Sequence, residues 1–379
     1  QRPKGKVLTF WYTGNVRGER EDCGCKKNPR GGLTRKATLI DQAPKSGREI
    51  DRPDAQLIVD SGDLLFSGVF IKRMADKDKK NAMIRAEAIV ASFNAIGCQA
   101  FLPGEYDLAL GVDALMKLKS KARFPWISAN LKKKGDKDLL LPAFTVTEAA
   151  GHKILFVGVT NPDAGRKNHY EEAGAEVLGP KAALLSQVDA IAAAKADAVV
   201  LLSNLGIEAT SKLLRSLPKD KLAITMALVS NTARSTYTPI WADGIPILES
   251  GNRGKTLGRI DMHVVDGKFA FRAEEESQGR LVRNYANAYR SVHNARRSLA
   301  VAPATNDAAR TKRLERNLRL AVERLAKIEA TLPTEVKAPS QDGDNGSWLH
   351  PQIVSVLLDI KQDPKVRRLI DSYEAKTSK

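Results

Sequence analysis

Apolar and polar positions over the first two thirds of the chain predict strands interleaved with helices. The apolar runs at residues 154–159 and 198–202 are continuous, which is typical of strands buried on both faces. The predicted strands cover residues 6–12, 55–60, 100–102, 154–159, 198–202 and 258–265. Helical spacing of apolar residues predicts helices over 33–40 and 81–96. This alternation predicts an α/β layered domain over residues 1–268.

The pattern changes after about Phe271, where only helical spacing continues. Apolar residues recur every three or four positions over 281–299 and again over 311–332, and Pro303 separates the two runs. We therefore expect an antiparallel helical hairpin in the part of the chain from 269 to 333.

The remaining part, 334–379, is predicted to hold a linker and a C-terminal helix. Residues 334–347 are polar and rich in Pro, Gly and Asp, as linkers are. An amphipathic helix is predicted over Ile353–Tyr373, with a new turn at Asp363-Pro364 because proline is tolerated at a helix's first position.

The net charge of the chain limits the classes of partner that we expect. Lys and Arg number 61 and Asp and Glu number 44, giving a formal charge of +17. Such a chain is drawn to polyanions, anionic surfaces or acidic partners. However, the longest basic run is Lys132-Lys133-Lys134, and no zinc-finger spacing or aromatic-basic interleaving accompanies it. We expect a solvated basic surface, an anionic ligand or an unidentified protein partner, and no nucleic acid. No apolar run approaches the roughly 20 residues that span a bilayer, so we expect no transmembrane segment.

Three cysteines, Cys23, Cys25 and Cys98, are too few for a disulfide framework. A Cys23–Cys25 disulfide would close a very small ring under strain and would be easily reduced, which suits redox chemistry. Thiolates could instead bind a soft metal such as zinc or copper(I). In the third interpretation Cys98 packs in the core and the Cys23–Cys25 pair only shapes a loop.

Seven short motifs follow the predicted elements in order. They are Thr13-Gly14-Asn15-Val16-Arg17-Gly18, Gly31-Gly32-Leu33-Thr34-Arg35, Asp60-Ser61-Gly62-Asp63, Gly104-Glu105-Tyr106-Asp107, Phe124 to Leu131, Leu202-Ser203-Asn204-Leu205-Gly206 and Gly251 to Gly258. In this order they resemble the 5'-nucleotidase branch of the calcineurin-like metallophosphoesterases over roughly residues 6–265. The resemblance implies a four-layer α/β sandwich of two packed sheets flanked by helices, followed here by the C-terminal hairpin. The Cys-Gly-Cys loop resembles a degenerate sub-branch of exported proteins.

The resemblance also implies a centre of two divalent metals held by Asp, His and Asn at strand ends, and this sequence departs from it. Such a pair activates water and stabilises charge on phosphoryl oxygens. The family's first Asp-x-His is Asn15 and Arg17 here, and only its bridging aspartate is kept, as Asp63. The third motif, Gly-Asn-His-Glu in the family, has Glu105, Tyr106 and Asp107 at its last three positions. Two further sites that carry histidine in the family are placed at Asn204 and Asn231.

We therefore predict a catalytically degenerate protein that acts as a binding or scaffold module. We expect no active phosphoesterase and no cofactor; any activity would be hydrolysis of phosphate esters. Arg17 either pairs with Asp63 or Glu105 or binds an anion, to which Arg253 could contribute. The alternative is a metal-dependent hydrolase or thiol-metal or redox protein, for example with zinc, at a site rebuilt around Cys23, Cys25 and Asp63. The resemblance implies export to the periplasm or cell envelope.

Overall fold

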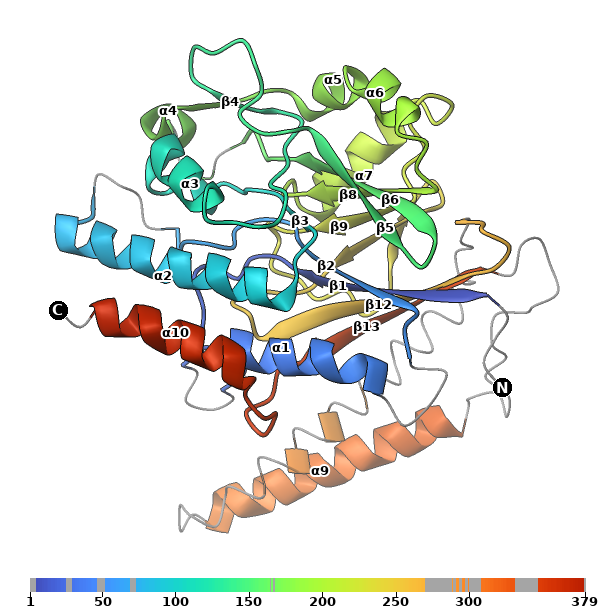
Figure 1. Cartoon of the computed structure of the whole chain (residues 1–379). Helices are drawn as coiled ribbons and strands as arrows, with labels where there is room; N and C mark the ends of the chain where they lie inside the picture. The colour runs from blue at the N-terminus through green and yellow to red at the C-terminus, as the bar shows by residue number, and fades with distance from the viewer. Residues whose placement is uncertain are drawn as a thin grey trace. The chain divides into compact units, whose positions relative to one another are not determined.

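The computed structural model of the protein (Figure 1) describes most of the chain. The described residues are 5–24, 29–45, 52–68, 73–163, 165, 168–269, 308–330 and 347–377, with a few positions between 288 and 299. The chain divides into two compact units, one made of Gln1–Phe271 and Ser347–Lys379 and the other of Arg272–Gly346.

The first sheet of the larger unit has the strand order β13-β12-β1-β2-β3 within the described residues. Its strands are β1 (Lys6–Thr13), β2 (Ala55–Asp60), β3 (Ala100–Phe101), β12 (Thr256–Val264) and β13 (Trp348–Ser355). β1, β2 and β3 run parallel, with Tyr12 opposite Val59 and Asp60 opposite Phe101. The antiparallel strands β12 and β13 complete the other side. Because β1 to β3 are parallel, the loops that leave their carboxyl ends lie along one edge.

The second sheet has the order β10-β11-β9-β8-β6-β5 in the part of the chain that the structure describes. Its strands are β5 (Phe144–Ala149), β6 (His152–Val159), β8 (Ala198–Ser203), β9 (Met226–Val229), β10 (Ile240–Ala242) and β11 (Ile245–Glu249). β6, β8, β9 and β11 are parallel, and the edge strands β5 and β10 are antiparallel to their neighbours.

The two sheets pack face to face over an apolar core. Leu8, Phe10 and Tyr12 of β1 lie in one buried cluster with Phe156 of β6, whose ring meets that of Phe10 edge to face at 6.3 Å. Trp11 points to the opposite face of the first sheet, as the two-residue period of a strand requires.

Helices cover the outer faces of both sheets. They are α1 (Leu33–Gln42), α2 (Asp76–Ile96), α3 (Gly111–Lys119), α4 (His169–Ala173), α5 (Pro180–Leu185), α6 (Val188–Ala193), α7 (Ile207–Ser216) and α10 (Pro364–Thr377). Ile40 of α1 packs with Trp11 outside the first sheet, and Leu213 of α7 packs with Leu201 outside the second. The resulting order, helices, sheet, sheet, helices, confirms the predicted four-layer sandwich (Figure 1). A small sheet of β4 (Leu131–Lys133) and β7 (Ala175–Val177), and short 3-10 turns at Ala43–Lys45 and Tyr106–Leu108, complete the unit.

The predicted helix over Ile353–Tyr373 is wrong in its first part. Residues Trp348–Ser355 instead form β13, an edge strand beside β12, and the helix begins only at Pro364. Pro351 fits this edge position, where a missing N–H leaves no ladder bond broken on the open side. Most of the predicted linker, at 334–346, lies outside the described residues.

The smaller unit contains α9 (Ala308–Glu329), which lies where the second helix was predicted, over 311–332; the antiparallel hairpin stays a prediction. The first helix, over 281–299, lies for the most part outside the described residues.

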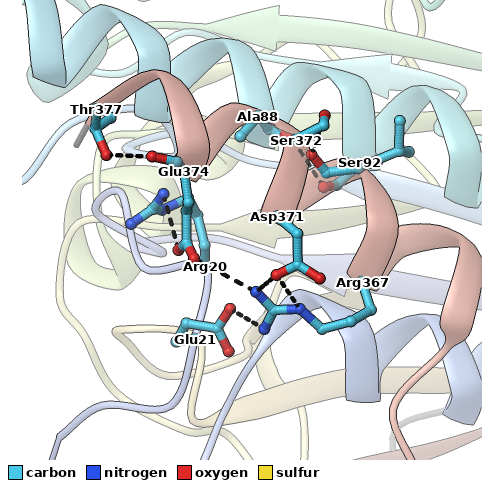
Figure 2. A network of polar contacts seen from close by, with 10 residues as sticks. Arg20, Glu21, Ala88, Ser92, Arg367, Asp371, Ser372, Glu374 and Thr377 are labelled. Carbon is cyan, nitrogen blue, oxygen red and sulfur yellow. Dashed lines mark hydrogen bonds and ion pairs between the residues drawn. The ribbon is translucent and has the colours of Figure 1, made fainter. Parts of the chain in front are cut away.

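A polar network fixes α10 to the loop that follows β1 (Figure 2). The Arg367 guanidinium donates to Glu21 Oε1 at 2.5 Å and to Asp371, its neighbour one helical turn away. Glu374 lies 3.5 Å from Arg367 and 3.4 Å from Arg20. Helix α10 therefore fixes the side chains of Arg20 and Glu21. Glu21 lies two positions before Cys23 in the sequence.

Candidate functional site

The predicted site residues gather where the carboxyl ends of the parallel strands of both sheets meet. Asn15 follows β1, Asp63 follows β2 and Glu105 follows β3, while Asn204 follows β8 and Asn231 follows β9. This end of a parallel sheet is where α/β proteins bind ligands. The strand topology thus brings together residues that are up to 216 positions apart, as the Asn15–Asn231 hydrogen bond shows.

The backbone after β1 and β2 is held in an uncommon conformation. Asn15, Arg17 and Asp63 have φ values of 53°, 55° and 57°, in the left-handed region that side chains seldom adopt. Backbone hydrogen bonds between the two loops fix it, since Asn15 N donates to Gly62 O and Arg17 N donates to Asp63 O, each at 2.8 Å. Such residues persist only where their surroundings determine them, and they concentrate at functional sites.

The side chain of Asn15 is hydrogen-bonded to other groups of the protein. Its Nδ2 donates to Glu249 Oε1 at 3.0 Å and to Gly251 O at 3.1 Å. Its Oδ1 accepts the backbone N–H of Asn231 at 2.8 Å. These three partners fix the amide orientation, with the nitrogen facing the buried Glu249 carboxylate. Glu249, from the end of β11, was not among the sequence-predicted residues.

Arg17 lies over Tyr106 and does not form a close ion pair with Asp63 or Glu105 among the described contacts. Its guanidinium carbon is 4.7 Å from the centre of the Tyr106 ring, a cation–π distance. Its Nε is buried and has no hydrogen-bond partner in the described part of the chain. The side chain as a whole is half-buried, so the guanidinium is within reach of a ligand.

Asp63 is buried, and its Oδ1 accepts the backbone N–H of Tyr106 at 3.1 Å. Burial raises the pKa of Asp63 to about 6, while the Tyr106 N–H and the charge of Arg17 oppose the rise. The glycine at position 104 leaves room for the Asp63 carboxyl, because a Cβ at this position would lie 2.3 Å from Asp63 Oδ1.

Asp107 acts as a structural brace. Its carboxylate accepts four backbone N–H groups, those of Asp63, Leu64, Leu65 and Gly104, at 2.7–2.9 Å. Burial and the neighbouring Asp63 carboxyl raise its pKa. With its acceptor capacity used, Asp107 holds the loops after β2 and β3 together.

Glu105 and Asn204 are hydrogen-bonded to each other. Asn204 Oδ1 accepts the Glu105 N–H at 3.4 Å, and its Nδ2 donates to Ser230 Oγ at 2.8 Å. Ser230 donates in turn to Ser61 O at 2.6 Å. Glu105 Oε1 accepts the Gly165 N–H at 2.9 Å. The Asn204 side chain, which stands where the family has a histidine, is therefore tied into the protein's own hydrogen bonds.

A buried lysine lies below the site and was missed by the sequence reasoning. Lys36 of α1 is 2% exposed, and its Nζ has no hydrogen-bond partner in the described residues. Burial lowers its pKa to about 8, against the attraction of Asp60 at the end of β2. Burial likewise raises the pKa of Asp60 to about 6, although Thr13 and Gly62 donate hydrogen bonds to it. Only the fold shows that a lysine in an amphipathic helix faces inward.

The cysteines are partly described. Cys98 is buried in the apolar cluster beside α2, and its thiol donates to Ala100 O at 3.3 Å. Cys23 is buried beside Arg253, which donates to its carbonyl and to Glu19 Oε1 at 2.5 Å. Cys25 lies outside the described residues, so a thiol-metal or redox site remains a prediction. Arg253 is already paired, which leaves Arg17 as the better-placed cation for an anionic ligand.

The side chains of the candidate site do not fit the two-metal centre that the fold implies. Among the described residues, no three His, Cys, Asp or Glu side chains are grouped to hold a metal ion. Asn15 and Asn204 turn amide nitrogens toward protein acceptors, and Arg17 supplies a permanent positive charge. A divalent cation needs oxygen, imidazole or thiolate donors, which this arrangement offers chiefly through Asp63 and Glu105.

The fold is that of the calcineurin-like phosphoesterases and 5'-nucleotidases, as predicted. No protein-family model matches the chain. A 144-residue segment is 28% identical to a 5'-nucleotidase of Vibrio vulnificus (strain CMCP6), covering 38% of this chain and 24% of that protein.

Two solved structures are similar over longer stretches. A 5'-nucleotidase precursor from Thermus thermophilus matches with a TM-score of 0.55 and 20% identity, over 70% of this chain and 52% of that one. The calcineurin-like phosphoesterase YfkN from Bacillus subtilis matches with a TM-score of 0.61 and 16% identity, over 98% of both chains. The chain thus spans only a quarter to a half of the two nucleotidases. No helix in the described ranges is both long and apolar enough to cross a membrane.

Proposed function

We propose that the protein is a catalytically degenerate relative of the 5'-nucleotidases that acts as a binding or scaffold module. The phosphoesterase fold is kept, while the described residues lack the donors of a two-metal centre at their expected places. The observation that carries this proposal is the Asn15 amide, which faces Glu249 through its nitrogen at 3.0 Å. A cation at that position would meet an N–H donor in place of a carboxylate.

The candidate site retains one feature suited to a ligand, the Arg17 guanidinium. It is stacked on Tyr106, half-buried, and its Nε has no hydrogen-bond partner among the described residues. A planar guanidinium recognises carboxylate or phosphate groups through paired hydrogen bonds. Asp63 and Glu105 lie nearby, so a ligand that also carries hydrogen-bond donors, such as a sugar phosphate with its hydroxyls, suits the candidate site better than a bare anion. We also propose export, which is supported by the precursor form of the Thermus neighbour.

The test is an assay of phosphomonoester and nucleotide hydrolysis with manganese added to the purified protein. We expect no metal-dependent turnover above that of an Asp63→Ala variant. Turnover that requires manganese and is abolished by Asp63→Ala would reject the proposal. The same preparations should be checked for folding by circular dichroism, so that an inactive wild type is known to be a folded one.

A further inference from the structure

A groove of about 430 Å³ lies between α2 and α10, on the outer side of the first sheet. Figure 1 shows the two helices side by side. The groove is lined by residues of α2, by Arg123, and by Lys365, Arg368, Leu369 and Ser372 of α10. The lining contains three cations and no carboxylate.

The groove arises from the way α10 divides its faces. Val366 and Ile370, one turn apart, are buried in the core and anchor the helix. Arg367, Asp371 and Glu374 form a stripe toward Arg20 and Glu21, where their charges are paired (Figure 2). That pairing leaves the acidic groups of α10 on the far side from the groove.

A second stripe of α10, also spaced by three and four residues, forms one wall of the groove. Lys365, Arg368 and Ser372 belong to it. The opposite wall is a matching stripe of α2, and Arg123 closes one end from the segment after α3. Lys365, Arg368 and Arg123 are all exposed, and no ion pair of theirs is among the described contacts.

The floor of the groove is apolar and shallow. Ala91, Ala95 and Leu369 are half-buried there, and the alanines keep the groove open because their side chains are short. An apolar floor flanked by exposed cations fits a segment that carries apolar side chains on one face and carboxylates beside them. Single-stranded nucleic acids are typically bound by stacking aromatics as well as cations, and no aromatic residue is among the described residues that line the groove.

We propose that the α2–α10 groove is a docking surface for an acidic, amphipathic segment of a partner protein. The proposal does not depend on the function of the candidate site at the strand ends. The carboxylates of the segment pair with Arg123, Lys365 and Arg368, and its apolar residues cover Leu369. The net charge of +17 assists the encounter by long-range attraction.

The experiment titrates the full chain into a labelled synthetic peptide and measures the fluorescence anisotropy of the peptide. The peptide carries Leu residues at helical spacing on one face and Glu residues beside them. The triple variant Arg123→Ala, Lys365→Ala, Arg368→Ala removes the rim charges. The control variant Lys153→Ala, Lys181→Ala, Lys212→Ala removes the same charge from exposed positions elsewhere. The control peptide carries Gln in place of Glu.

The proposal predicts that the rim variant weakens binding about tenfold, as expected for three exposed pairs, and that the control variant changes it less than about twofold. The Gln peptide should bind at least about tenfold more weakly than the Glu peptide. Equal losses in both variants would show attraction to the net charge alone and would overturn the proposal. Loss of binding to phosphatidylserine vesicles in the rim variant, with peptide binding unchanged, would identify a membrane surface and would overturn it too. Because all three rim side chains are exposed, the variants should melt at the wild-type temperature.

Discussion

Replacing Asp63 with asparagine should stabilise the protein at neutral pH. The change keeps the size of the side chain and an oxygen that can accept the Tyr106 N–H, but it removes the charge. In the wild type that charge is buried, and burial outweighs the attraction of Arg17, so the pKa rises from 3.8 to about 6. At about 1.4 kcal/mol for each pH unit between the two values, ionising Asp63 costs the folded state about 3 kcal/mol.

The direction in which stability changes with pH follows from proton binding to Asp63. Between pH 3.8 and about 6 the folded protein holds the Asp63 proton more tightly than the unfolded chain does. This contribution to stability therefore falls as the pH rises through that window, and the loss is complete above about pH 6. Asp63→Asn should match the wild type near pH 4 and exceed it by up to about 3 kcal/mol at about pH 7.5.

Urea denaturation of both proteins at several pH values measures this difference directly. Asp60 titrates in the same window but is present in both proteins. Removing the Asp63 charge also lowers the pKa of Asp107, so the difference between the two curves reports the Asp63–Asp107 pair. Asp113→Asn is the matched control, because its side chain is 97% exposed and should change stability by less than about 0.5 kcal/mol. A stability difference that does not depend on pH, or an asparagine variant that is weaker at neutral pH, would refute the reasoning.

Three further changes test other parts of the structure. Asn15→Asp places a second carboxylate against Glu249 and should lower the free energy of unfolding by about 2–4 kcal/mol at pH 7, as measured by denaturation. This loss of stability should disappear at acidic pH. A variant that gains stability when manganese is added would contradict the account. Lys36→Met should stabilise the protein at pH 7 by up to about 3 kcal/mol, because it removes a buried charge. The advantage of the variant should shrink between pH 8 and 10.5, since the lowered pKa of Lys36 makes the stability of the wild type rise with pH in that range. A stability difference that stays constant with pH would argue against a charged buried lysine. Arg367→Ala should accelerate amide hydrogen exchange at residues 20–24 with a loss of at most about 1 kcal/mol, and unchanged exchange there would show that α10 does not hold this loop.

Much of the fold could be predicted because its strands are long, apolar and bounded by recognisable motifs. The segments at 154–159 and 198–202 lie within β6 and β8, and the helix predicted over 81–96 lies within α2. Shorter strands such as β9 and β11 give weak periodicity and were not predicted individually. Their apolar runs are only four or five residues long, and such runs cannot be assigned by spacing alone.

The error at β13 has a similar cause. Ile353, Val356 and Leu357 have helical spacing, and only pairing with β12 shows that Ile353 belongs to a strand opposite Gly258. That partner is 95 residues away, so no local pattern could reveal it. The edge position also tolerates Pro351, a residue that argues against a strand when read locally.

The candidate site shows the same limit more sharply. The motifs placed Asn15, Asp63 and Glu105 at strand ends, where the structure has them. The contacts that decide their chemistry are long-range, such as the Asn15–Glu249 hydrogen bond. The role of Asp107 could not be predicted either, because three of the four backbone N–H groups that its carboxylate accepts belong to residues more than 40 positions away.

The most direct test of the central claim is a measurement of manganese binding to the folded wild-type chain by equilibrium dialysis, repeated with Asp63→Ala. The account predicts no tight binding and no difference between the two proteins, because amide nitrogens and a guanidinium occupy the positions where metal ligands are expected. Retention of about two manganese ions per chain that is lost in Asp63→Ala would contradict it, since paired ions are the working centre of this fold's hydrolases.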